Sequence, residues 1–186
     1  IDVSLVGSEM CIRDRDDESV FGPSPNWGDW RDGPGVDARL REVLEAAETL
    51  VRDRLAAYGR GAARYGLIHA DMRLANLLID GGDTRLIDFD DCGFGWFMYD
   101  FAAGISFMEE HPQVPALREA WLDGYRAVRP LDREDEVEID SFIMLRRMAL
   151  LAWTGSHAGT DLARSQAPHF AAGTARLAEA YLARFA

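Results

Sequence analysis

The sequence that decides the fold of this 186-residue chain is His69-Ala70-Asp71-Met72-Arg73-Leu74-Ala75-Asn76, followed twelve positions after Asn76 by Asp88-Phe89-Asp90. These two stretches hold several carboxylates and one carboxamide at short spacing. Oxygen atoms of this kind are the ligands that Mg²⁺ prefers in proteins. The fold therefore depends on whether the chain brings the two stretches together.

The residues between the two stretches predict a β-hairpin. Short segments expected to be extended, at 77–79 and 85–87, flank Asp80-Gly81-Gly82-Asp83, which is typical of a tight turn. A third segment expected to be extended, at 67–69, precedes Asp71. We therefore expect Asp71 and Asn76 on a loop before the hairpin. The hairpin would return Asp88 to the side of Asn76, where both could share one cation.

The pattern suits phosphoryl transfer. That reaction needs a carboxylate to orient and deprotonate the attacking hydroxyl, and Mg²⁺ to neutralise the nucleotide phosphates. The spacing predicts Asp71 as the base, with Asn76, Asp88 and Asp90 as magnesium ligands. The alternative is structural: His69 packs, Asp71 caps a turn and Asn76 bonds to backbone. The strand, the hairpin and Asp-Phe-Asp together favour the functional interpretation.

Three segments carry a family resemblance. Leu67-Ile68-His69-Ala70-Asp71, Asn76-Leu77-Leu78 and Leu86-Ile87-Asp88-Phe89-Asp90-Asp91 resemble the aminoglycoside phosphotransferase and choline kinase superfamily, which includes type II homoserine kinases. The resemblance implies an α+β, mainly helical fold: a protein-kinase-like C-terminal lobe with a short β-hairpin beside the catalytic loop and the N-lobe missing. It also implies ATP and Mg²⁺ as cofactors, and a small molecule whose hydroxyl group is phosphorylated.

The resemblance also implies roles for individual residues. Asp71 is the implied catalytic base, and Asn76 and Asp88 are the implied metal and cofactor ligands. Asp90 stands where many members have a second acid that can reach a second metal. Structural support of the loop is implied for two further residues, His69 and Asp100.

Two alternative functions remain open at this point. A protein Ser/Thr kinase is disfavoured because Ala70 replaces the arginine of His-Arg-Asp, Asp90 replaces the glycine of Asp-Phe-Gly, and no Ala-Pro-Glu follows. A catalytically inactive, kinase-like binding module is disfavoured because Asp71, Asn76 and Asp88 are all present.

The amino-acid composition limits which classes of binding partner are expected. The 20 basic residues are all arginine and the 32 acidic residues leave a net charge of -12, which disfavours nucleic-acid binding. The acidity favours a cationic substrate such as an amine, although homoserine and sugars remain open. The two cysteines form neither a disulfide framework nor a metal motif, so we expect a cytoplasmic protein. No apolar run is long enough to span a membrane.

The first 20 residues are expected to form a disordered tail. Residues 9–15 resemble a translated adaptor from DNA sequencing libraries, so the chain up to about residue 15 is interpreted as an artefact. Residues 21–186 would form the kinase-like lobe. Because the chain has no lysine, we expect an N-lobe with a glycine-rich flap and a lysine to precede it in the gene. This fragment alone would have little or no activity.

The spacing of apolar residues, together with residues that start or stop helices, predicts the remaining elements. Trp27 and Trp30 should pack on the body from a loop, and Asp132 should cap a helix that begins with acidic residues. Arg146-Arg147 is interpreted as a surface pair or a salt bridge to that acidic stretch, with contact to an acidic substrate as the alternative. Helices are expected at 37–58, 98–110, 113–128, 133–154 and 168–185.

Overall fold

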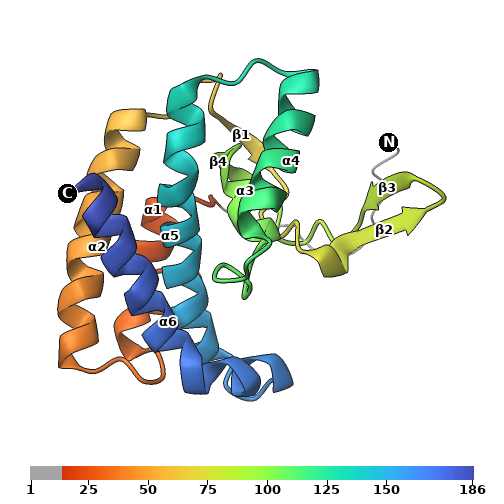
Figure 1. Ribbon diagram of the computed structural model, residues 1–186. Coiled ribbons are helices and arrows are strands. Elements are labelled where there is room, and N and C mark those ends of the chain that lie inside the picture. Colours follow the sequence, from red (N-terminus) through yellow and green to blue (C-terminus); the bar gives the residue numbers. More distant parts are fainter. Residues whose placement is uncertain (1–13) are drawn as a thin grey trace.

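The computed structural model describes residues 14–186 (Figure 1). The first 13 residues, and with them most of the adaptor-like stretch, lie outside the described residues. The elements in chain order are α1 (Asp17–Phe21), η1 (Trp30–Asp32), α2 (Ala38–Tyr58), β1 (Tyr65–Ile68), η2 (Leu74–Asn76), β2 (Leu77–Asp80), β3 (Asp83–Leu86), β4 (Gly93–Trp96), α3 (Tyr99–Gly104), α4 (Val114–Val128), α5 (Arg133–Ser156) and α6 (Asp161–Phe185).

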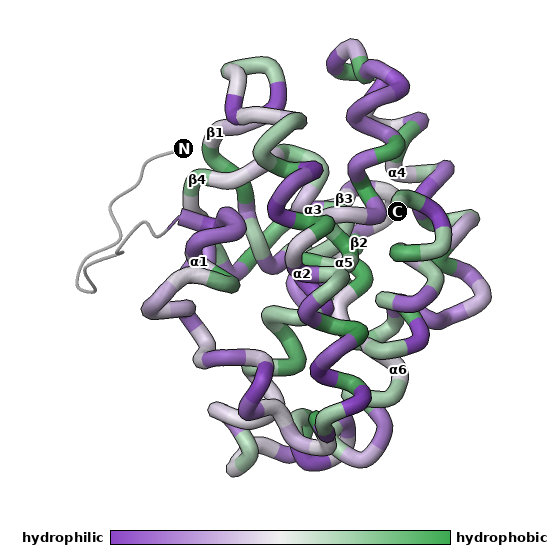
Figure 2. The backbone as a smooth tube through the Cα atoms, turned by 90° about the vertical axis from the view of Figure 1, so that its left-hand side faces the viewer, coloured by the Kyte–Doolittle hydropathy of each residue, from purple (hydrophilic) through white to green (hydrophobic). Residues whose placement is uncertain are grey.

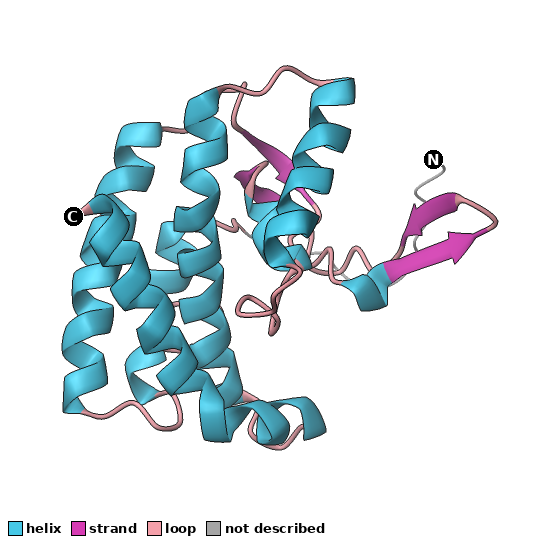
Figure 3. Ribbon diagram, in the orientation of Figure 1, coloured by secondary structure: helices cyan, strands magenta, loops and turns pink. Residues whose placement is uncertain are grey.

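The long helices form one layer of the molecule. Helix α5 packs against α2, α3 and α6, and α2 also packs against α6. Figure 3 shows the short strands beside this helical layer, with the β2–β3 hairpin projecting away from the body. Most of the described chain is helical, and this confirms the predicted mainly helical α+β class. No helix within residues 14–186 has the length and apolar character needed to cross a membrane.

The core lies around α5. Its side chains Phe142, Leu145, Met148 and Leu151 are fully buried. Along α2 the buried residues recur at helical spacing, which is why one face of that helix is apolar; they are Leu44, Ala47, Val51, Leu55 and Tyr58. In Figure 2 the colour alternates between hydrophobic and hydrophilic along the helices, as expected when each helix buries one face.

The β2–β3 hairpin is confirmed. Leu77 pairs with Leu86 and Asp80 pairs with Asp83 in an antiparallel register. The turn between them places Gly81 and Gly82 at φ values of 62° and 129°. A side chain would strain both positions, so the two glycines explain why the chain reverses here.

One strand was not predicted. Between the hairpin and the helix expected to begin at residue 98, Gly93–Trp96 forms β4, which pairs antiparallel with β1 and places Trp96 opposite Tyr65. Glycine at alternate positions hid the strand pattern. It is needed at Gly95, where a Cβ would lie 2.5 Å from the side chain of Ile68.

Two helix boundaries also differ from the prediction. The helix expected to reach residue 110 ends at Gly104, and the next turn contains Phe107 at a φ of 68°. The last helix begins at Asp161, capped by the side chain of Thr160, and contains Pro168. Pro168 is exposed, so the carbonyl group that loses its helical partner can bond to water instead.

The predicted disordered tail is wrong for residues 14–20. Arg15 donates a backbone hydrogen bond of 2.7 Å to the carbonyl oxygen of Phe94, at the edge of β4. Asp16 is buried, and its side chain caps α1 by accepting from the backbone N–H of Ser19. This short segment is therefore held by the body of the protein.

The acidic start of α5 has the structural role that was expected. Asp132 caps the helix and forms a reciprocal capping box with Asp135. Asp135 also accepts a hydrogen bond from Tyr58, and burial followed by this contact raises the pKa of the Tyr58 hydroxyl. Trp30 is buried and Trp27 packs against the core, which confirms the predicted packing of both.

A core substitution should show how far the lobe depends on α5. We expect Leu145→Ala to lower the free energy of unfolding by about 2–5 kcal/mol, because it removes a fully buried side chain and leaves a cavity. Urea denaturation of the purified chain would measure the change. Val128→Ala, at a side chain that is 91% exposed, is the matched control and should change stability by less than about 0.5 kcal/mol.

Candidate active site

The loop that follows β1 has a constrained backbone. Ala70 is buried and lies at a φ of 64°, in the left-handed region that residues with a side chain seldom adopt. The carboxylate of Asp100 accepts hydrogen bonds from the backbone N–H groups of His69, at 3.1 Å, and Ala70, at 2.7 Å. The first turn of α3 thus holds the unusual conformation in place.

Asp100 is an unusual anchor because it lies in a poorly solvated position. Burial raises the pKa of its carboxyl group, and the two backbone hydrogen bonds, His69 and Arg146 act in the opposite direction. A carboxylate is the side chain best suited to this position, since it can accept from two neighbouring N–H groups at once.

Asp71 is buried and surrounded by donors. Its Oδ1 accepts from Arg146 Nη2 at 2.9 Å, and its Oδ2 accepts from Asn76 Nδ2 at 2.9 Å. Arg73 folds back over its own loop and contacts both oxygens, with Nε at 2.9 and 3.0 Å and Nη2 at 2.8 Å from Oδ2. The structure therefore joins Asp71 and Asn76 directly.

The orientation of Asn76 leaves its oxygen available. The Nδ2 group donates to the backbone oxygen of Asp71 at 2.8 Å as well as to the carboxylate. Within residues 14–186 no hydrogen bond engages the amide Oδ1 of Asn76. Side-chain oxygens of this type are suitable ligands for Mg²⁺.

The hairpin brings Asp88 back towards the loop. Ile87 donates its backbone N–H to the carbonyl oxygen of Asn76 at 3.1 Å. Asp88 is the next residue after Ile87, so the hairpin returns it close to Asn76 in space. His69 braces the same point, with Nε2 3.1 Å from the oxygen of Ile87. Asp88 has a φ of 64° and an exposed side chain.

Asp90 is also exposed, and no hydrogen bond or ion pair within residues 14–186 joins it to Asp71. Within residues 14–186, no group of three or more His, Cys, Asp or Glu side chains is arranged to hold a metal ion. The donors that fit Mg²⁺ are thus a carboxamide and exposed carboxylates at Asn76, Asp88 and Asp90. Such a set suits an ion that keeps water and phosphate oxygens as its remaining ligands.

The site contains arginines that sequence reasoning missed or misplaced. The interpretation of Arg146-Arg147 as a surface pair or a salt bridge to the acidic stretch is wrong, because both are buried and neither pairs with residues 132–140. Arg146 pairs with Asp71, while Arg147 pairs with Glu109. The available signal was their position inside an otherwise apolar run of α5, since buried arginines need partners.

Arg146 is held firmly in its charged form. Burial opposes the charge, but Tyr99 and Asp71 beside it raise the pKa of the guanidinium group overall. Its Nε donates to Ser106 Oγ at 3.0 Å, and its guanidinium lies 5.0 Å from the ring centre of Trp27.

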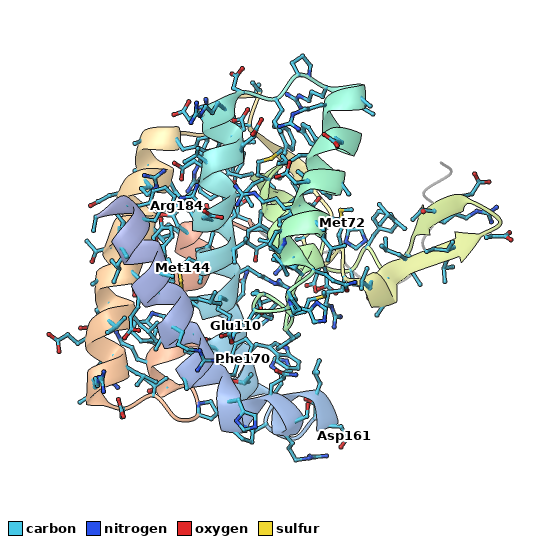
Figure 4. All side chains as sticks on the ribbon, viewed as in Figure 1. Met72, Glu110, Met144, Asp161, Phe170 and Arg184 are labelled. Carbon is cyan, nitrogen blue, oxygen red and sulfur yellow. The ribbon has the colours of Figure 1, made fainter. Side chains whose placement is uncertain are left out.

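Figure 4 shows Met72, the neighbour of Asp71, at the base of the hairpin near α3 and α4.

The fold and this site define a phosphotransferase lobe. The model of the phosphotransferase enzyme family matches residues 15–136, which is more than half of the chain. The chain belongs to this family, and the resemblance seen in the sequence is confirmed.

Several proteins that are similar to this chain are named as kinases of small molecules. The structure of a microcompartment-associated aminopropanol kinase matches with a TM-score of 0.86 and 45% identity, over 92% of this chain and 54% of that one. Homoserine kinase of Neisseria meningitidis serogroup B is 39% identical over 75 residues, 38% of this chain and 25% of that protein. The amicoumacin kinase hAmiN, solved with AMP-PNP, Ca²⁺ and Ami, matches with a TM-score of 0.59 and 22% identity over 75% and 46% of the two chains, and shows the fold alone.

The chain spans between a quarter and just over half of the length of these relatives. The similarity places the chain in a family of small-molecule kinases.

The anchoring contact of Asp100 can be tested by stability. Asp100→Asn should lower the free energy of unfolding by about 1–3 kcal/mol, because an amide can accept from only one of the two N–H groups and turns a donor towards the other. Urea denaturation at neutral pH measures the change. Asp83→Asn on the exposed hairpin is the control. Equal stability of the two variants would contradict the anchoring role.

Proposed function

We propose that the intact protein transfers the terminal phosphate of ATP to a hydroxyl group of a small molecule, with Asp71 as the base. The observation that carries this proposal is the contact between the Asp71 carboxylate and Asn76 on a loop that Asp100 holds in a strained conformation. A carboxylate held this rigidly can orient a hydroxyl for attack.

In the reaction, the substrate hydroxyl donates its hydrogen bond to the Asp71 carboxylate. Its oxygen forms a bond to the terminal phosphorus, the hydroxyl proton passes to Asp71, and the bridging P–O bond breaks with its electrons leaving on ADP. Arg146 keeps one carboxylate oxygen fixed at 2.9 Å, which holds the orientation of the carboxylate that receives the hydroxyl proton.

Asn76 and Asp88 would hold the metal, with Asp90 as a further ligand. The free amide oxygen of Asn76 and the exposed carboxylates of the other two support this assignment. When bound there, Mg²⁺ would neutralise the charge on the nucleotide phosphates. A protein of the same fold has been solved with a nucleotide analogue and a divalent cation.

We infer that the substrate is a small, amine-bearing alcohol. The aminopropanol kinase shares 45% identity with the chain, and the name of homoserine kinase, another relative, gives a substrate that also carries an amine and a hydroxyl group. A net charge of -12 favours a cationic alcohol over an anionic one. We place the reaction in the cytoplasm, where ATP is supplied.

A second lobe is proposed to cover the nucleotide. Large apolar side chains around the hairpin and the β1–β4 pair are exposed, and a surface of this kind marks a region that is normally covered; they are Leu67, Leu74, Leu78, Ile79, Phe89 and Phe94. We propose that an N-lobe supplies this cover and the lysine that the chain lacks. The chain alone would then have little or no activity.

The role of the base is tested by substitution in the full-length gene product. Asp71→Asn should lower kcat by about 10²–10⁴-fold, because the amide cannot accept the hydroxyl proton. ADP release in the presence of 1-amino-2-propanol or homoserine measures turnover. Unchanged turnover would refute the assignment. If the wild-type protein turns over neither these nor any other small alcohol, an inactive binding module replaces the proposal, and phosphorylation of a peptide instead would identify a protein kinase.

The metal assignment has its own test. Asp88→Asn in the full-length protein should raise the Mg²⁺ concentration needed for half-maximal turnover by about 10-fold or more, because one charged ligand is lost. A Mg²⁺ titration at saturating ATP measures this. Asp80→Asn, on the exposed end of the hairpin, should leave the titration unchanged. Identical titrations for all three proteins would exclude Asp88 as a ligand.

A further inference from the structure

The carboxylate of Asp71 has no free acceptor position in this structure. Its Oδ1 accepts from Arg73 Nε and Arg146 Nη2, each at 2.9 Å. Its Oδ2 accepts from Arg73 Nη2 at 2.8 Å and Asn76 Nδ2 at 2.9 Å. A carboxylate offers about four lone-pair positions, so a substrate hydroxyl can reach the base only if one donor leaves.

The donors differ in what it costs to move them. Asn76 is also fixed to the backbone oxygen of Asp71, and it is buried. The side chain of Arg146 is 4% exposed and is held by Ser106, so moving it would leave a buried charge without a partner. The side chain of Arg73 is 33% exposed, and its hydrogen bonds and ion pairs within residues 14–186 are to Asp71 alone. Arg73 is the donor that can leave at the smallest cost.

Resting on the proposed function, we propose that Arg73 is a phosphate-binding residue that exchanges partners. In the nucleotide-free chain its guanidinium covers the Asp71 carboxylate. When nucleotide binds, the guanidinium moves to oxygens of the terminal phosphate and exposes the base to the hydroxyl. The exchange is chemically matched, because the planar fork of arginine bonds to a phosphate as it does to a carboxylate.

The positions of the positively charged side chains support Arg73 as the phosphate-binding residue. The chain has no lysine, so any cation that it contributes to the phosphates is an arginine. Within residues 14–186, Arg146 is buried beneath the base and Arg15 is paired with Asp91. Arg85 lies on the projecting hairpin. Arg73 is the arginine on the catalytic loop itself, where charge on the transferring phosphoryl group needs a donor.

The exchange leaves Arg73 chemically unchanged. The hydroxyl proton moves to Asp71, the new P–O bond forms, and ADP departs with the electrons of the broken bond. Arg73 stays on the phosphoryl oxygens through the transfer and returns to the carboxylate when the product leaves. In the absence of nucleotide, the same contact keeps water away from the base.

Nucleotide binding tests the proposal without relying on turnover. Calorimetric titration of the full-length protein with AMP-PNP and with ADP compares ligands that differ in the terminal phosphate. Arg73→Gln should weaken AMP-PNP binding by about 10-fold and ADP binding by less than about 2-fold, since one charge-assisted contact is lost to the terminal phosphate only. Arg85→Gln removes the same charge from the nearby hairpin and should change neither affinity.

Arg73→Lys separates charge from folding. It should recover part of the AMP-PNP affinity, and kcat should follow the order arginine, lysine, glutamine while the KM for the alcohol stays constant. Equal weakening of both nucleotides, or of neither, would overturn the proposal, as would a loss of alcohol affinity alone. If Arg73 governs AMP-PNP binding but the wild-type protein phosphorylates no alcohol, the phosphate site stands and the proposed function fails.

Discussion

The geometry of the site depends on one carboxylate that accepts two consecutive backbone N–H groups. Asp100 fixes the peptide units of His69 and Ala70, and Ala70 in turn has a positive φ that would be costly without such support. The turn produced here directs Asp71 inward towards α5 and leads the chain on to Asn76. A contact between a helix terminus and a loop thereby supports the backbone conformation from which Asp71 and Asn76 meet.

Helix α5 connects this loop to the core. Its consecutive arginines point to different partners: Arg146 reaches Asp71, and Arg147 reaches Glu109 and Thr174. Buried guanidinium groups cost desolvation and are retained where their partners require them. The base is therefore held by the same helix whose apolar side chains form the centre of the lobe, so site geometry and lobe stability are linked.

The sequence was sufficient where the signal was local. Asp-Gly-Gly-Asp between two segments expected to be extended identified the hairpin, and the acidic residues after Asp132 identified a helix start. It was insufficient where a tertiary contact decided the outcome. Strand β4 exists because Gly95 fits against Ile68, Pro168 is tolerated because its face of α6 is exposed, and Arg146 is internal because Asp71 is there. The spacing of Asp71 and Asn76 anticipated that they would lie together, but the arginines around Asp71 required three-dimensional information.

The projecting hairpin has a consequence for handling the chain. Strands β2 and β3 pair only with each other within residues 14–186, so the outer edge of each offers unpaired backbone groups, and Ile79 is 78% exposed. Unprotected strand edges with apolar side chains promote pairing between molecules. Concentrated solutions of this polypeptide should accordingly self-associate through the hairpin, and a charged residue at position 79 would be the first substitution to try for solubility.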